Sequence, residues 1–143
     1  MENTLNLLLS NLVVEYHKLQ NFHWYVKGKD FFTAHAKLEE LYDYINEAID
    51  EVAELILMTN GQPKANLKDF LETAVIKEAD AKYIDSNTVY NVVLEDFNLI
   101  LDSVKVSKDA AEAEGVDVVS AQMDDYIKEF TKTIWMINQT INK

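Results

Sequence analysis

The sequence predicts an all-α fold, in which one domain spanning residues 1–143 forms a bundle of four long helices. The first observation is the scarcity of helix breakers, with one proline and three glycines in 143 residues. The second is that apolar residues recur every three or four positions in four long stretches. The third is the hydrophobic share of 48%, which suffices for one buried core in a chain of this length.

The first helix is predicted over residues 3–27. Its apolar stripe runs into a histidine near the end of the helix and consists of Leu5, Leu8, Leu9, Leu12, Tyr16, Leu19 and His23. Gly28 follows and is expected to end the helix, because glycine readily adopts the left-handed conformation found at helix ends.

The second helix is predicted over residues 31–60, with Asp30 as its N-cap. At about 100° per residue, its apolar side chains share one arc of the helix surface. His35, Glu39, Asp50 and Glu54 fall together in the neighbouring arc. Three more carboxylates lie just beyond, so the helix has a core face, a ligand face and an acidic face; these carboxylates are Glu40, Glu47 and Glu51.

A long connection over residues 61–86 separates the second and third helices. Asn66 is placed to cap a short helix at 67–73 within it. The third helix is predicted at 87–114, Gly115 breaks it, and the fourth follows from 117 to 141. Because so long a crossover suits consecutive helices that run parallel, this order predicts a four-helix bundle of ferritin-like topology.

The formal net charge of −12 limits the classes of partner. Phosphate backbones and anionic membranes bind clustered basic residues, so we expect neither as a direct partner. No uninterrupted apolar stretch reaches the roughly 18 residues of a membrane span. The chain has no cysteine and no basic secretory start, which fits a cytoplasmic protein. The acidity would attract cations, although it is also an ordinary means of staying soluble.

Four potential metal ligands have an unusual arrangement along the chain. His23 and His35 flank the short break at 27–30, where a turn would bring them together. Asp50 and Glu54 are one helical turn apart and project from one face. Fifteen residues of helix separate His35 from Asp50, or about 22 Å. One copy of the chain cannot close these groups around one metal, whereas two copies with antiparallel second helices could.

Imidazole and carboxylate donors suit first-row metals such as Fe(II), Zn(II) or Mn(II). With Glu39 one turn after His35, the set could hold one iron firmly and a second more weakly. The ordinary alternatives are that His23 is a hydrogen-bonded core histidine and that the carboxylates form a solvated face. A di-iron site within one bundle takes Glu-x-x-His from two helices, and this chain has no such motif. His17 lies apart and is read as a surface residue.

The order and spacing of several motifs resemble the Dps family, the DNA-binding proteins from starved cells or mini-ferritins. The motifs are NFHWYVKG at 21–28, FFTAH at 31–35, LEELY at 38–42, IDEVAE at 49–54, GQP at 61–63 and IWM at 134–136. This resemblance covers nearly the whole chain. It implies a hollow dodecamer built from two-fold dimers, which oxidises Fe(II), preferentially with hydrogen peroxide, and stores the ferric mineral inside.

The resemblance also implies ferroxidase centres at the two-fold interfaces, with two irons in each centre. One subunit would supply His23, His35 and Glu39, and its partner Asp50 and Glu54. The family often has aspartate where Glu39 stands, which bears on the weaker iron position. Zinc or manganese are possible substitutes for iron. Trp24 matches a tryptophan beside the centre, where it would either intercept oxidising equivalents or pack in the interface.

Two further features follow from the resemblance. Acidic three-fold pores for iron entry would lie near the start of the last helix, with Glu112, Glu114, Asp117 and Asp124 as candidates. Carboxylates of the inner wall would seed mineral or simply be solvated, and these are Glu40, Glu47 and Glu51. The family name implies DNA binding, but neither 1–3 nor 141–143 carries a basic tail, so we expect none. The rival functions are a nucleoid-associated, DNA-protecting protein with iron oxidation secondary, and a purely structural helical bundle.

Overall fold

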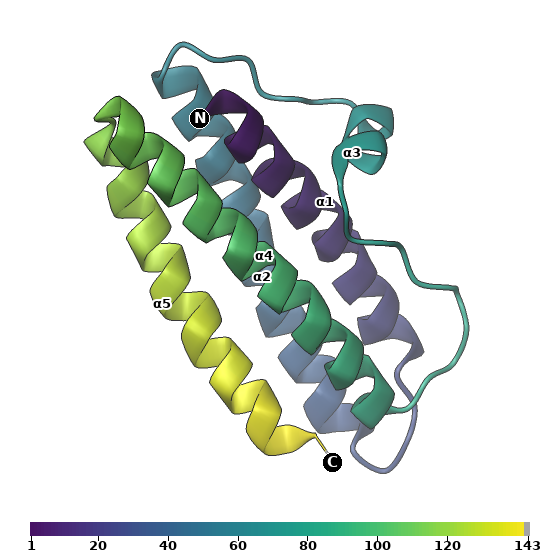
Figure 1. Cartoon of the computed structure of the whole chain (residues 1–143). Helices are drawn as coiled ribbons and strands as arrows, with labels where there is room; N and C mark the ends of the chain where they lie inside the picture. The colour runs from purple at the N-terminus through teal and green to yellow at the C-terminus, as the bar shows by residue number, and fades with distance from the viewer. Residues whose placement is uncertain (142–143) are drawn as a thin grey trace.

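Four long helices lie side by side in the computed structural model, which describes residues 1–141 (Figure 1). The helices are α1 (Glu2–Tyr25), α2 (Phe31–Met58), the short α3 (Leu67–Thr73), α4 (Ser86–Glu114) and α5 (Asp117–Thr140). Within residues 1–141 no strand occurs beyond one isolated bridge pair. The predicted all-α, ferritin-like four-helix bundle is confirmed, and its element boundaries lie within about two residues of those expected from periodicity. The prediction that the C-terminus lacks a basic tail involves Asn142 and Lys143, which lie outside the described residues.

The long crossover makes α2 and α4 run in the same direction, as its length predicted (Figure 1). α1 and α5 run the opposite way. α1 packs against both α2 and α4, and α4 packs against α5. The bundle interior is apolar, and Phe130 at its centre packs edge-on against Phe97 with ring centroids 5.2 Å apart. Each such buried side chain stabilises the fold by about 1.5–3 kcal/mol. None of the described helices is long and apolar enough to cross a bilayer.

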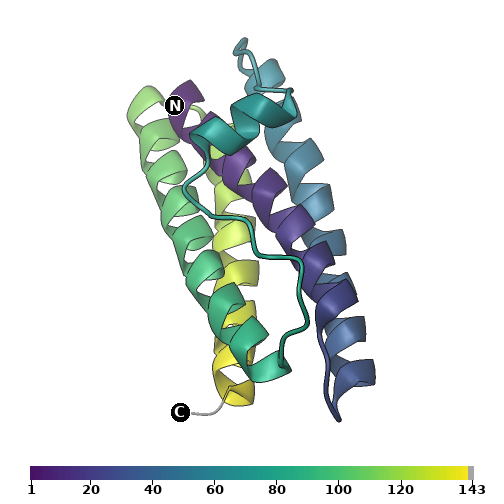
Figure 2. The same cartoon turned by 90° about the vertical axis from the view of Figure 1, so that its right-hand side faces the viewer.

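Asparagines of α1 fasten the crossover along the outside of the bundle (Figure 2). The Asn11 carboxamide oxygen accepts hydrogen bonds from the backbone N–H groups of Val75 and Ile76, at 2.9 and 3.3 Å. The Asn21 amide donates to the Ala79 carbonyl at 3.1 Å. Because a long loop carries many backbone polar groups, such partners fix its path where no ladder is available. The crossover is therefore a defined strap on α1.

α1 ends two residues earlier than predicted, because the last part of the crossover pairs with the residues at its end. Val26 and Ile84 form the isolated bridge, in which the Lys27 N–H donates to the Ile84 carbonyl at 2.9 Å. The Ile84 N–H in turn donates to the Tyr25 carbonyl at 3.2 Å. This pairing draws the chain out of the helix, so Gly28 does not end it. Gly28 instead lies in the turn before α2, at a φ of +144° that favours glycine.

The ends of α2 also differ from the expectation in detail. Asp30 occupies the N-cap position, but its side chain makes no cap hydrogen bond. It accepts one from the Ser86 hydroxyl at 2.6 Å instead, which joins the start of α2 to that of α4. Asn66 likewise begins α3 without a side-chain cap. At the other end of α2, Asn60 takes the left-handed conformation with a φ of 64°, and the Gly61 N–H donates back to the Ile56 carbonyl.

Candidate metal centre

His23 and His35 are brought together by the turn between α1 and α2, as the sequence predicted. Their rings are stacked, with centroids 3.6 Å apart and planes inclined by 10°. The Nδ1 atom of His23 lies 2.6 Å from the His35 carbonyl oxygen, and the Nδ1 atom of His35 lies 2.7 Å from the His23 carbonyl oxygen. Each ring is therefore fixed by the main chain of the other helix. We call this arrangement the reciprocal histidine pair.

The hydrogen bonds of the pair select one tautomer. A carbonyl oxygen only accepts hydrogen bonds, so each Nδ1 must carry the proton and donate. In the neutral ring this leaves the Nε2 lone pair of both histidines free, which is the arrangement of a metal-ligating imidazole with an oriented outer hydrogen bond. The Nε2 atom of His23 lies 3.7 Å from a carboxylate oxygen of Glu39. We call His23, His35 and Glu39 the histidine half-site, although the structure does not bring the three close enough together to hold a metal ion by themselves.

Aromatic rings support the half-site from both sides. Phe31 stacks on His35 at 4.7 Å, and Tyr42 meets His23 edge-on at 5.3 Å. Burial, followed by the charge of the Glu39 carboxylate, raises the pKa of Tyr42. Neither ring was among the predicted site residues. Their position beside His35 was predictable, because Phe31 and Tyr42 lie four residues before and seven residues after it and therefore share its face of the helix.

Asp50 and Glu54 form a second, separate acidic half-site. Both are exposed and lie one turn apart on α2. A hydrogen bond with Asp50 and the negative charge of that residue raise the pKa of Glu54. A cation between the two carboxylates would remove this repulsion, because an opposite charge favours the ionised form. α2 is unbroken from Phe31 to Met58, so the estimate of about 22 Å between His35 and Asp50 holds.

The two half-sites do not meet within one chain. Over residues 1–141 no three side chains of His, Cys, Asp or Glu come close enough together to hold a metal ion. Trp24, the sixth predicted site residue, is 57% exposed, and its ring meets His17 edge-on at 6.1 Å. His17 is exposed, as predicted, and interacts with Gln20 rather than with the histidine pair. Each half-site thus lacks ligands that a neighbouring molecule would have to supply.

Most of the carboxylates predicted to line a pore have partners within the chain. Lys108 pairs with Glu112 at 2.8 Å and with Asp124 at 3.0 Å. The hydrogen bond and charge of Lys108 lower the pKa of Glu112. Glu114 pairs with the N-terminal ammonium of Met1 at 3.0 Å. Asp117 is exposed. The role of these four residues in iron entry stays a prediction, and it now has to account for a lysine among them.

The carboxylates predicted for the inner wall divide in a similar way. The Tyr126 hydroxyl donates to Glu51 at 2.9 Å, and Lys37 pairs with Glu40 at 2.9 Å. Glu47 is exposed. The role of these carboxylates in seeding mineral stays a prediction.

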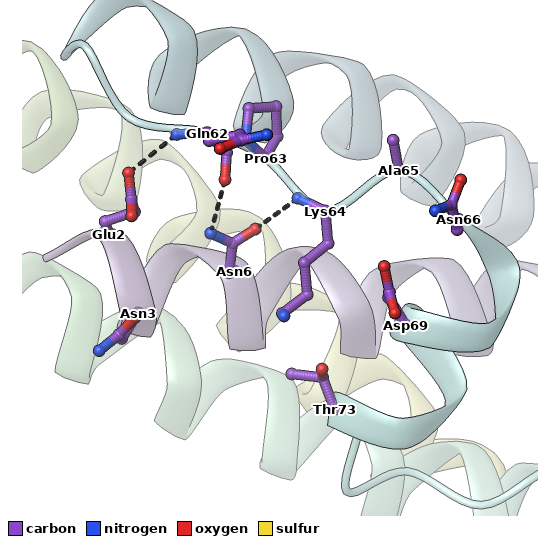
Figure 3. A pocket seen from close by; sticks show the side chains of 10 residues that line it. All are labelled: Glu2, Asn3, Asn6, Gln62, Pro63, Lys64, Ala65, Asn66, Asp69 and Thr73. Atoms are coloured by element: carbon purple, nitrogen blue, oxygen red, sulfur yellow. Dashed lines mark hydrogen bonds between the residues drawn. The ribbon is translucent and has the colours of Figure 1, made fainter.

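A cavity lies away from these groups, beside the start of α1 (Figure 3). It has a volume of about 630 Å³ and none of the predicted metal ligands lines it. The Glu2 carboxylate accepts a hydrogen bond from the Gln62 N–H at 2.8 Å. The Asn6 side chain accepts from the Lys64 N–H and donates to the Gln62 carbonyl. The polar residues that line this cavity thus hold the start of the crossover in place, which is a structural role.

Comparisons with known proteins agree with the fold and with the family resemblance. The chain matches the ferritin-like domain family over residues 2–143. It is 42% identical to the DNA protection during starvation protein of Brevibacillus brevis, with 93% of this chain and 89% of that protein covered. This chain belongs to the Dps family of ferritin-like proteins.

Two further relatives place this Dps protein among close neighbours. General stress protein 20U of Bacillus subtilis is 40% identical, over 92% of this chain and 90% of that protein. The crystal structure of a Dps protein from Vibrio cholerae superposes with a TM-score of 0.93 at 36% identity, covering 96% of this chain and 86% of that one. That protein is described as a member of a broad superfamily of ferritin-like diiron-carboxylate proteins.

Proposed function

We propose that this Dps protein oxidises Fe(II) to Fe(III), preferentially with hydrogen peroxide, and stores the ferric product inside a dodecameric cage, which would protect the cell against oxidative damage. The observation that carries the proposal is the reciprocal histidine pair. Each ring donates from Nδ1, which leaves the Nε2 lone pairs of both neutral rings free, and Glu39 lies beside the Nε2 atom of His23. Membership of a ferritin-like family supports iron as the substrate.

The completed centre requires two copies of the chain. About a two-fold axis, antiparallel α2 helices would bring the acidic half-site of one copy, Asp50 and Glu54, to the histidine half-site of the other. The mixed set then offers two nitrogen donors and three carboxylates, which is enough for two iron ions. Zinc or manganese would bind the same donors, but zinc has no oxidation step.

The chemistry needs two electrons for each peroxide. Two Fe(II) ions give one electron each, the O–O bond breaks, and two hydroxide ions and two Fe(III) ions result. Because both electrons arrive together, no hydroxyl radical is released. The protein's part is to hold the two ions near one peroxide in a fixed geometry, which replaces a collision of three molecules. Hydrolysis of Fe(III) to mineral follows in the interior of the cage.

Fe(II) oxidation measured under nitrogen tests the proposal. The protein is loaded with about two Fe(II) per subunit, peroxide is added in steps, and Fe(III) absorbance is recorded. We expect about two irons oxidised per peroxide, in a phase absent from protein-free buffer. The variant His23→Gly/His35→Gly/Asp50→Ala should lose the fast phase while gel filtration shows the same assembly. Oxidation no faster than in buffer would reject the proposal.

Direct protection of DNA is the second candidate, because several relatives are named DNA protection during starvation proteins. We propose that this chain does not bind DNA directly. Its net charge of −12 per subunit opposes the phosphate backbone. A gel shift at low and physiological salt, without divalent cations, decides between them. Free DNA at both salt concentrations is expected, and retarded DNA at physiological salt would contradict the charge argument.

A further inference from the structure

A buried cluster of three charged side chains lies between α1 and α4, away from the residues of the metal centre. Its members are Glu15 and Lys18 of α1 and Asp96 of α4. Glu15 is 0% exposed, and as a carboxylate neither of its oxygens receives a hydrogen bond; when protonated, it can donate one to Asp96. A charged carboxylate in such surroundings is strongly unfavourable, because burial removes its hydration and nothing here replaces it.

The single positive charge of the cluster is already engaged. The Lys18 ammonium lies 2.8 Å from a carboxylate oxygen of Asp96, and both side chains are 7% exposed. With all three groups ionised, the buried cluster would carry a net charge of −1. With Glu15 protonated, it carries none. A buried group in this position takes up a proton rather than remain charged.

The charged groups around Glu15 act in the same direction. Burial is the largest effect, followed by the charge of Asp96 and a hydrogen bond with Asp96, and together they raise its pKa well above the ordinary value for glutamate. Lys18 acts against them, more weakly. Among the described residues of α2, α3 and α5, no charged group adds a further effect on Glu15.

Lys18 is the member of the cluster that borders a pocket. The pocket has a volume of about 300 Å³ and lies on the side of the bundle covered by the crossover. Glu78, Asp80 and Lys82 of the crossover line the same pocket, whereas neither Glu15 nor Asp96 does.

We propose that Glu15 is a proton-binding site, held as a neutral carboxylic acid inside the bundle, and that loss of its proton weakens the contact between α1 and α4. The sign follows from linkage. A carboxyl of this kind keeps its proton up to a higher pH in the folded state than in the unfolded state. It therefore stabilises the fold at pH values below its titration in the folded state, most strongly at low pH. The stabilisation disappears as the pH rises through the titration of the folded state.

Infrared difference spectroscopy on the full-length, iron-free protein in its own assembly tests the first half of the proposal. A protonated carboxyl gives a C=O stretching band separate from that of carboxylates. We expect this band in the wild type at neutral pH, its disappearance on alkaline titration, and its absence from Glu15→Gln. The exposed neighbour of Asp96 provides the matched control, and Glu95→Gln should keep the band.

Two results would overturn the assignment. The first is a wild type without the band, and the second is a Glu15→Gln variant that retains it. If Asp96→Asn loses the band in that second case, the proton resides on Asp96. The wild-type spectrum alone is informative, so the test does not depend on any variant folding.

Urea unfolding from neutral to alkaline pH tests the second half. The unfolding midpoint of the wild type should fall with rising pH more steeply than that of Glu15→Gln, because the amide cannot lose a proton in this range. Equal slopes for the two proteins would show that the buried acid does not control the α1–α4 contact. Neither measurement involves iron, so its outcome is independent of the proposed ferroxidase function.

Discussion

The reciprocal histidine pair shows how single residues decide whether a half-site exists. Each imidazole donates from Nδ1 to the main-chain carbonyl of the other residue, over 2.6 and 2.7 Å. Loss of one ring removes two things at once. A predicted metal ligand is lost. The main-chain carbonyl of the other histidine also loses its hydrogen-bond donor, which lowers the stability of the fold by on the order of 1 kcal/mol.

We predict that His35→Ala slows Fe(II) oxidation by peroxide at least tenfold. Loss of even an outer partner of a metal ligand costs about 10–100-fold, and His35 is predicted to be a ligand itself. Stopped-flow absorbance gives the rate. The control is His17→Ala, which removes an exposed histidine of the same helix pair and should leave the rate unchanged. Equal rates for both variants would remove His35 from the centre.

At the residue scale, the grouping of His23, His35 and Glu39 could be predicted from the sequence, and the contacts that could not be predicted have physical causes. Helical phase alone placed His35 and Glu39 on one face, and the turn after α1 brought His23 to them. It missed Tyr42 and Phe31 because aromatic residues at helical spacing usually indicate core. Nor could spacing reveal that Glu15, on the apolar side of α1, faces Asp96 across the bundle. That contact depends on how two helices are rotated against each other.

The elements of this fold were predictable from their periodicity, whereas their ends were set by contacts far along the chain. Gly28 was expected to end α1, and α2 was expected to run to residue 60. In the structure α1 stops because Ile84 pairs with Val26, and α2 stops as Asn60 enters the left-handed conformation. Asp30 and Asn66 occupy cap positions without capping, and Asp30 reaches Ser86 instead. A propensity gives the position of such a residue but not its partner.

Gly115, between α4 and α5, allows a prediction about one helix end. Its φ is +70°, and a Cβ there would meet nothing within 4 Å. We therefore expect Gly115→Ala to lower the free energy of unfolding by about 1–2 kcal/mol through backbone strain alone. Urea unfolding gives the value.

The reverse exchange at Asn60, the other described helix end with a left-handed residue, provides the comparison. Asn60→Gly should stay within about 1 kcal/mol of the wild type, because relief of strain and greater freedom of the unfolded chain oppose each other. A Gly115→Ala variant as stable as the wild type would show that the α4–α5 turn can adopt another conformation.

At the scale of the whole molecule, the chain carries two groups of predicted ligands that lie far apart. His35 of one group and Asp50 of the other are separated by about 22 Å along the unbroken helix α2. Sequence distance was enough to predict this separation, because α2 contains no breaker. The manner in which copies assemble cannot be obtained from one chain. It depends on how surfaces match, and the packing of Trp24, which is 57% exposed, in such a surface stays a prediction.

Mixed assemblies test the shared centre directly. We predict that His35→Ala subunits and Asp50→Ala/Glu54→Ala subunits are each inactive alone and regain activity when refolded together. In a mixed two-fold dimer, one of the two centres receives every ligand and the other receives neither half intact. The measurement is peroxide-driven Fe(II) oxidation before and after mixing. Mixtures no more active than the separate variants would place the two half-sites in different centres.

The reciprocal pairing of His23 and His35 has a consequence for repeated use of the protein. Their donors are oriented by main-chain carbonyls, which do not change protonation or move away when a cation departs. The geometry is thus assembled as soon as the chain folds, without help from cargo or neighbour. In the proposed function, an arriving ion would meet two nitrogen atoms that are already in position, and its departure would leave their positions unchanged. Successive rounds of loading and release can begin from the same starting state.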